Sequence, residues 1–379
     1  MAMLGRRRFV AAGMVAVGNS VLSLPAARSR ASEAIVLRQL AEQKGLVYGT
    51  TISAKQIETD RPFVGLVLRQ AGLVVAENEM KWQVLNRGTP GDDDWSPADT
   101  IANFARDNNL VLRGHNLLWY HRTPSWYFDL SSREDQERAV VKHIEELAGR
   151  YRGRIHSWDV VNEPIEPKDG RPDGLRTKVF LETIGPDYLD LAYRTAREAD
   201  PKARLVVNEY DIELDAPEQE ARRIALLHLL EKMKRSGTPV DAVGIQAHLT
   251  AVGGAPFSAP LFRRFLDDLA GLGLTIQITE LDVTDEHAPS EVTVRDRLVA
   301  DTYRRFLDAA LDEPAVKVVV TWGLSDRHSW IVRRETYEAK WRTDDEASRP
   351  LPFDADLQPK SACEAMAKAF AHAPQRPAG

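Results

Sequence analysis

The sequence predicts an α/β protein in which strands and helices alternate along a single domain. Short apolar runs recur along the chain, and the longer segments between them carry apolar residues at helical spacing. Eight such runs alternating with helices are typical of a closed (β/α)8 TIM barrel. An open doubly wound sheet is the alternative, but residues 49–52 do not form the glycine-rich phosphate turn expected after its first strand.

The predicted strands are rich in Val, Leu and Ile, as parallel strands buried on both faces are. They span residues 46–49, 73–76, 110–114, 155–162, 204–207, 242–245, 274–279 and 316–321.

The predicted helices are marked by apolar periodicity, caps and breakers. Ser131 and Glu134 form the pattern of a capping box, which predicts a helix beginning there. A helix over 218–235 is predicted to bury Ile224, Leu227, Leu230 and Met233. Further helices are predicted at 188–199, 261–269, 292–311 and 361–370.

The N-terminus has the features of an export signal. The motif Arg6-Arg7-Arg8 precedes a weakly apolar stretch, and small residues follow up to Ala31, a pattern similar to a twin-arginine signal peptide. We therefore predict a signal peptide and short leader over 1–31, the barrel domain over 32–373 and a C-terminal tail over 374–379. A periplasmic or secreted protein, with no membrane anchor after signal removal, is expected; a disordered basic tail is the alternative.

Charge and cysteine content narrow the possible partners. A net charge of -6, without a basic run beyond the N-terminus, gives no support for nucleic-acid binding. Cys363 is the only cysteine, so an intrachain disulfide is impossible and core packing must supply the stability. We expect a monomer.

Polar or aromatic side chains follow seven of the eight predicted strands. In a barrel of this class the active site lies at the C-terminal face of the strands, where their ends meet at one rim. Any one of these groups could be a helix cap, but seven on one rim indicate a binding site. They are Glu77 and Asn78, His115, Asn162 and Glu163, Asn208 and Tyr210, Gln246 and His248, Glu280, and Trp322.

Two of these groups are the carboxylates Glu163 and Glu280. A carboxyl pair across a barrel mouth suits glycoside hydrolysis, which needs roughly 5–5.5 Å between the groups for retention and more for inversion. His248 could hydrogen-bond Glu280, and Asp282 could orient His248, since residues two apart in an extended chain point the same way. This network would keep Glu280 ionised, while Glu163 could stay protonated. A helix-capping role remains the alternative for both Glu163 and Asp282.

Indole side chains near the strand ends fit a sugar ligand, whose rings present apolar faces edged by hydroxyls. Ligand contact is predicted for Trp322 and Trp330, and core packing for Trp126 and Trp158. The tryptophans near strand ends are Trp82, Trp119, Trp126, Trp322, Trp330 and Trp341. The chain has no His-x-His or His-Glu-x-x-His spacing and no Gly-x-Ser-x-Gly turn, so no metal, cofactor or serine nucleophile is predicted.

Several strand-end segments carry specific motifs. They are Glu77-Asn78-Glu79-Met80-Lys81-Trp82, Arg113-Gly114-His115-Asn116-Leu117-Leu118-Trp119, Trp158-Asp159-Val160-Val161-Asn162-Glu163, Gln246-Ala247-His248, Ile278-Thr279-Glu280-Leu281-Asp282, Trp322-Gly323-Leu324-Ser325-Asp326 with Trp330, and Phe353-Asp354 with Gln358-Pro359-Lys360. Together they cover about residues 46–370 and resemble glycoside hydrolase family 10, the barrel endo-1,4-β-xylanases.

The resemblance implies a retaining double displacement on xylan or xylo-oligosaccharides, with Glu163 as general acid/base and Glu280 as nucleophile supported by His248 and Asp282. A β-1,4-glucanase or other retaining glycosidase is the alternative, and a non-catalytic glycan-binding barrel is a more distant one. The substrate-binding residues that the resemblance implies are Glu77, Asn78, Lys81, His115, Trp119, Asn162, Tyr210, Gln246, Trp322 and Trp330.

The chain departs from the family pattern in two places. After Trp119 the family usually continues His-x-Gln, where this chain has Tyr120-His121-Arg122. The family's Asn-Asp-Tyr-Asn is Asn208-Glu209-Tyr210-Asp211 here. Arg122 places a cation where an amide is usual near the glycone side, so we hypothesise an altered preference for substrate decoration or chain length, with acidic side groups favoured.

Overall fold

The computed structural model describes residues 35–332, 342, 344 and 346–376. The chain divides into a segment Met1–Ala34, which lies outside the described residues, and a compact unit that begins at Ile35. The predicted export signal over 1–31 and Trp341 therefore fall outside the described part of the chain.

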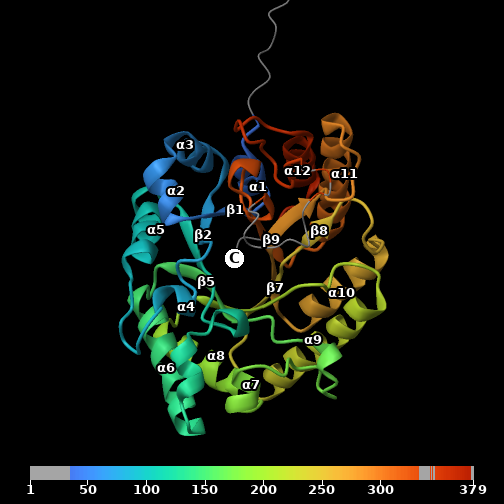
Figure 1. Ribbon diagram of the computed structural model, residues 1–379. Helices are drawn as coiled ribbons and strands as arrows, with labels where there is room; N and C mark the ends of the chain where they lie inside the picture. Colours follow the sequence, from blue (N-terminus) through green and yellow to red (C-terminus); the bar gives the residue numbers. More distant parts are fainter. Residues whose placement is uncertain (1–34, 333–341, 343, 345, 377–379) are drawn as a thin grey trace, which may run out of the picture. The chain divides into compact units, whose positions relative to one another are not determined.

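Eight parallel strands close into a barrel, which confirms the predicted (β/α)8 fold (Figure 1). They pair in the order β10-β1-β2-β3-β5-β6-β7-β9, and pairing of β9 with β10 closes the ring. Two short strands, β4 (Leu118–Trp119) and β8 (His248–Thr250), extend the sheet beside the ends of β5 and β9. The barrel strands are β1 (Val47–Ile52), β2 (Leu73–Ala76), β3 (Val111–Gly114), β5 (Ile155–Asn162), β6 (Arg204–Glu209), β7 (Ala242–Ile245), β9 (Thr275–Thr284) and β10 (Val316–Thr321).

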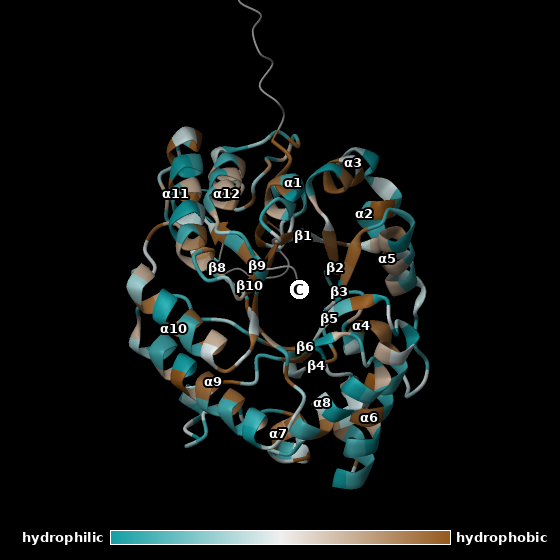
Figure 2. Cartoon of the chain, turned by 180° about the vertical axis from the view of Figure 1, so that it is seen from behind, coloured by the Kyte–Doolittle hydropathy of each residue, from teal (hydrophilic) through white to brown (hydrophobic). Residues whose placement is uncertain are grey.

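Helices form an outer ring around the strands (Figure 1). Seen from behind, the strands are largely apolar and the helices carry polar residues outward (Figure 2). The helices are α1 (Leu37–Glu42), α2 (Ala54–Thr59), α3 (Arg61–Gln70), α4 (Trp82–Leu85), α5 (Ser96–Asp107), α6 (Arg133–Arg150), α7 (Phe180–Thr183), α8 (Tyr188–Ala199), α9 (Pro217–Arg235), α10 (Ala259–Gly271), α11 (Val292–Ala310) and α12 (Ser361–His372). The short 3-10 helices are η1 (Tyr120–Arg122), η2 (Ser125–Asp129), η3 (Pro167–Asp169), η4 (Asp326–His328) and η5 (Trp330–Val332).

The strands are buried on both faces, which explains their nearly continuous apolar runs. Their outer faces join the large core beneath the helices. A smaller apolar cluster formed by β2, β10 and the residue after β10 consists of Leu73, Val75, Val318, Val320 and Trp322. Among the described residues, no helix has the length and apolar character needed to cross a membrane.

Two helix predictions need correction. The N-cap of α6 is Ser132, whose hydroxyl accepts a hydrogen bond from the Asp135 N–H at 3.1 Å, so the predicted capping pair was one residue too early. In α9 the predicted apolar residue Ile224 is 46% exposed. The buried face is rotated toward Arg223, which reaches inward to donate to the carbonyls of Ile212 and Leu214.

Arg376 joins the end of the described chain to the barrel. It lies in the segment predicted as a tail, yet it is 2% exposed. Its guanidinium donates to the Val316 carbonyl at 3.1 Å and the Leu311 carbonyl at 2.8 Å. Its backbone N–H donates to the Lys44 carbonyl at 2.9 Å. These contacts tie the segments that precede β1 and β10 to the C-terminal segment.

Candidate active site

A cleft with a volume of about 290 Å³ lies at the C-terminal ends of the barrel strands. Every predicted site residue except Asp282 lines it, and Tyr120, His121 and Arg122 of η1 complete the wall. The structure therefore brings together side chains from the ends of seven barrel strands that are far apart in the sequence.

Glu280 lies within β9, which runs five residues beyond its predicted end. Its carboxylate accepts a hydrogen bond from the Asn208 amide at 2.7 Å, and its other oxygen lies 3.4 Å from His248 Nε2. Burial alone would raise the pKa of Glu280, but the hydrogen bond from His248, the charges of His115 and His248, and the Asn208 amide lower that pKa to about 2. The carboxylate is therefore held in the ionised form that a nucleophile requires.

His248 is held from behind by Asp282. The short strand β8 pairs with β9 so that the two residues are in register. His248 Nδ1 lies 2.9 Å from Asp282 Oδ1, and the Trp330 indole donates to Asp282 Oδ2 at 2.6 Å. Asp282 thus orients both side chains from within a strand, rather than capping a helix.

Glu163 follows the last residue of β5 and has a φ of 59°, a left-handed conformation that costs energy for a residue with a side chain. The backbone is fixed on both sides, because its N–H donates to the Asn208 carbonyl at 2.8 Å and its carbonyl accepts from Arg176 Nε at 2.8 Å. Such strain is common where a side chain must project into a functional site, here the cleft.

Within the described part of the chain, the Glu163 carboxyl group receives three hydrogen bonds, all from cleft residues and none from a helix N-terminus. Trp119 Nε1 donates to one oxygen at 3.0 Å. Gln246 and Asn162 donate to the other at 3.1 and 3.2 Å. Pairing of β4 with β5 puts Trp119 in register with Asn162, which explains how the indole reaches Glu163.

Asn208 connects the two carboxylates; it was predicted to lie on the rim, but no catalytic or substrate-binding role was predicted for it. Its amide nitrogen contacts Glu280 Oε1 at 2.7 Å and Asn162 Oδ1 at 2.8 Å, while its oxygen accepts from Thr279 at 2.7 Å. It packs over Gly244, where a Cβ atom would lie 2.2 Å from the amide oxygen. Its position near the end of β6 confirms the predicted place on the rim.

Lys81 lies between two indole rings in the cleft. Its Nζ is 5.1 Å from the Trp119 ring centre and 5.8 Å from that of Trp322, and it donates to Asn78 at 3.0 Å. Burial lowers the pKa of Lys81 to about 8, although Glu280 and Glu77 favour the charged form. The lysine is therefore a cation near neutral pH that loses its charge in mild alkali.

The interior of the barrel supports His115 through a buried ion pair. Asp159 lies 2.8 Å from His115 Nδ1 and accepts from Arg113 Nη1 at 2.7 Å. Arg113 also donates to Gln277 at 3.0 Å. The His115 ring in turn packs edge-on against Trp322, with 5.0 Å between ring centres, so the pair fixes part of the cleft floor.

The tryptophans near strand ends divide between cleft and core. Trp119, Trp322 and Trp330 line the cleft. Trp158 is fully buried, and Trp126 is partly buried and donates to Asn86 at 3.0 Å, so both pack as predicted. Trp82 does not reach the cleft: it is 4% exposed and stacks on His143, with 4.2 Å between ring centres.

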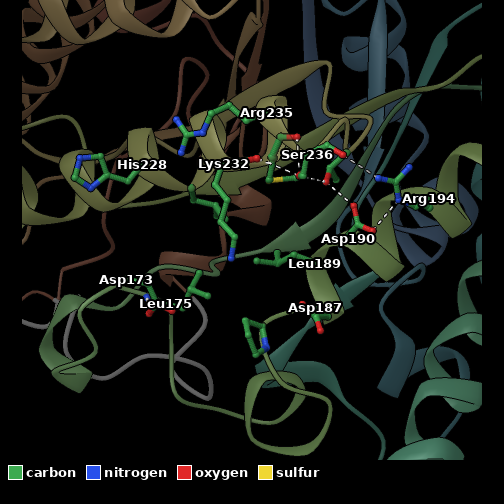
Figure 3. A pocket seen from close by; sticks show the side chains of 14 residues that line it. Asp173, Leu175, Asp187, Leu189, Asp190, Arg194, His228, Lys232, Arg235 and Ser236 are labelled. Atoms are coloured by element: carbon green, nitrogen blue, oxygen red, sulfur yellow. Dashed lines mark hydrogen bonds and ion pairs between the residues drawn. The ribbon is translucent and has the colours of Figure 1, made fainter.

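A second, larger cavity of about 500 Å³ lies between α8 and α9 (Figure 3). Arg194 and Asp190, one turn apart on α8, form an ion pair at 2.7 Å beside it. No Trp, Tyr or Phe is among the described residues that line it, so it lacks the large rings on which sugars stack. Among the described residues, no group of three or more His, Cys, Asp or Glu side chains could hold a metal ion.

The parallel barrel and the two buried carboxylates joined by side-chain amides at its rim define an enzyme of the glycoside hydrolase class. Comparison with known families narrows this class. Residues 36–369 match Glycosyl hydrolase family 10, and the chain belongs to this family.

Several curated relatives and solved structures are similar to the chain. Endo-1,4-beta-xylanase C of Paenibacillus barcinonensis is 33% identical over 89% of this chain, which spans only 32% of that longer relative. Endo-1,4-beta-xylanase 3 of Hypocrea jecorina is 31% identical, over 86% of this chain and 82% of the relative. Crystal structures of xylanase 10B from Thermotoga maritima, and from Thermotoga petrophila in complex with xylobiose, each superpose with a TM-score of 0.78. Their identities are 28% and 29%, over 89% of this chain and 98% and 97% of theirs.

Proposed function

We propose that this protein is an endo-1,4-β-xylanase that hydrolyses its substrate with retention of configuration. The observation that carries the proposal is the unequal environment of the two carboxyl groups. Glu280 is surrounded by groups that hold its negative charge, namely His248, His115 and Asn208. Glu163 instead receives hydrogen bonds from neutral indole and amide groups.

In the proposed first step, Glu163 gives its proton to the glycosidic oxygen as that oxygen leaves the anomeric carbon. A Glu280 oxygen attacks the same carbon and forms a glycosyl ester. In the second step Glu163, now ionised, removes a proton from water. The water oxygen attacks the anomeric carbon, and the Glu280 carboxylate departs. Two displacements at one carbon restore the original configuration.

Supporting roles follow from the contacts. His248 and Asp282 keep the nucleophile oriented and charged. Asn162 would bind the 2-hydroxyl of the sugar at the cleavage point, a bond that gains strength as charge develops at the anomeric carbon. Trp119, Trp322, Trp330 and Tyr210 present rings to the cleft on which sugar rings can stack. Glu77, Asn78, Lys81, His115 and Gln246 supply hydrogen-bonding groups.

The test compares reducing-sugar release from xylan and from carboxymethyl-cellulose. Activity on xylan is expected to dominate, and NMR of the first products should show the β-anomer. Glu280→Gln should lower kcat by at least about 10³-fold. Glu163→Ala should lose activity on xylan but regain it with azide on substrates that have a good leaving group. Inverted products, or an unchanged rate for Glu280→Gln, would refute the mechanism.

We also propose that the protein acts outside the cytoplasm as a monomer. The support for export is the arginine motif and apolar stretch within residues 1–31. Replacing Arg6-Arg7 by two lysines should leave the protein in the cytoplasm of an expressing bacterium, as fractionation would show. Sedimentation of the mature chain should give a mass near that of one copy, and a dimer mass would exclude the monomer.

A further inference from the structure

Arg122 lies in the cleft without a role in the proposed cleavage reaction. It lies in η1 and lines the cleft. Its Nε atom is buried without a hydrogen-bond partner, and among the described residues the guanidinium forms no ion pair. A buried donor without a partner is uncommon, because its desolvation is not offset.

Arg176, another arginine beside the cleft, is fully engaged. It donates to the carbonyls of Glu163 and Ile165 and to the Tyr210 hydroxyl, at 2.8 to 3.1 Å. Its role is to hold the loop that carries Glu163. Arg122 makes none of these structural contacts, so its side chain is available to a ligand in the cleft.

Two other basic side chains of the cleft, Lys81 and His121, lie close enough to Arg122 for its charge to affect their pKa values. Burial lowers the pKa of Lys81, and the positive charge of Arg122 lowers it further. Burial likewise lowers the pKa of His121, with Arg122 among the cations that add to the effect. Glu163 and Glu280 line the same cleft, but their oxygens contact amide, indole and imidazole groups rather than the Arg122 guanidinium.

We propose that Arg122 binds the carboxylate of an acidic sugar substituent on the polysaccharide, that is, a uronic acid attached to the main chain. The planar guanidinium can donate two parallel hydrogen bonds to a carboxylate, a geometry that a neutral hydroxyl does not match. Such a ligand would also give the buried Nε atom a partner. This inference rests on the proposed function and specifies which xylans the enzyme prefers.

The test measures kcat/KM on three substrates: xylan bearing uronic acid groups, the same xylan after chemical reduction of its carboxyl groups, and linear xylo-oligosaccharides. The readout is the ratio of kcat/KM on the acidic xylan to that on the reduced xylan. Arg122→Gln keeps a side chain that can form hydrogen bonds, but it removes the positive charge and the pair of parallel N–H donors. It should lower this ratio about tenfold relative to the wild type.

The matched control is Lys178→Gln. Lys178 is exposed and close enough to His121 to influence its pKa, but it does not line the cleft. This variant should keep the ratio of the wild type. An equal loss in both variants would overturn the proposal in favour of general electrostatic attraction. A ratio unaffected by Arg122→Gln would overturn it in favour of contacts with neutral sugar.

Two measurements keep the test independent of folding and of the proposed function. In the wild type alone, the preference for acidic xylan should weaken as ionic strength rises, and a salt-independent preference counts against the ion pair. Linear xylo-oligosaccharides report on the proposed reaction itself. If the wild type does not cleave them, the proposed function fails; if it cleaves them and the ratio does not respond to Arg122→Gln, only this inference fails.

Discussion

Replacing Asp159 by Asn tests how the interior of the barrel supports the cleft. Asp159 and Arg113 are both fully buried, and Asp159 also holds His115 Nδ1 at 2.8 Å. The amide keeps the size of the side chain, but it removes the charge and replaces one acceptor with a donor. Arg113 is then left as a buried cation whose remaining partner, Gln277, is neutral.

Removing one partner of a buried ion pair costs about 3–5 kcal/mol, because the other charge stays desolvated. A unit of this size has an unfolding entropy of about 0.7 kcal/mol/K, so the midpoint of thermal unfolding should fall by roughly 4–7 °C. Activity should fall as well, because His115 loses the group that fixes its ring beside Trp322.

Circular dichroism during heating, together with urea unfolding, measures the change. Asp312→Asn is the control, since it breaks an ion pair to Arg263 in which both side chains are about half exposed, and it should cost less than about 1 kcal/mol. The double variant Arg113→Gln with Asp159→Asn should recover at least half of the loss, because no uncompensated charge remains. If Asp159→Asn costs no more than the surface control, the buried pair does not stabilise the barrel as argued.

Three further predictions concern the cleft. Glu280 has a pKa of about 2 in the fold against 4.5 for the free side chain, so its ionised form stabilises the fold above about pH 4.5 and this contribution is lost as the pH falls toward 2. The difference in urea stability between wild type and Glu280→Gln should change by about 3 kcal/mol across that window, and a constant difference would contradict the assigned pKa. Asn208→Ala removes a hydrogen bond to this carboxylate and should raise the pKa of Glu280 to between about 3 and 4; the acidic limb of the kcat/KM profile must then move upward. Because the pKa of Lys81 is about 8, the wild-type KM should increase as the pH rises through 8, whereas Lys81→Arg should keep a flat KM to pH 9.

Much of the barrel could be predicted because its strands carry a strong apolar signal and most end in a polar group. The same pattern located both carboxylates and the pair formed by His248 and Asp282, since parallel strand ends must meet at one rim. The short strands β4 and β8 were missed, because two or three residues carry no recognisable period. They nevertheless set the register of Trp119 and His248.

Other errors concern the direction of side chains. Trp82 follows a strand end like the cleft tryptophans, but as the first residue of α4 it turns toward His143. Arg176 lies in a loop without periodicity, and only the folded loop brings it to the Glu163 carbonyl. Ile224 was placed on the wrong face of α9, because arginines are rarely expected to turn inward.

The seam between β1 and β10 has a consequence for the order of folding. Val47 lies opposite Val318, so the barrel cannot close until nearly the whole described chain is available. Contacts of such long sequence separation form late and slow the folding rate. Until then β1 and β9 present open edges, at which strands of other molecules can pair. A chain that ended before β10 would keep both edges, and we would expect it to aggregate rather than to form a smaller barrel.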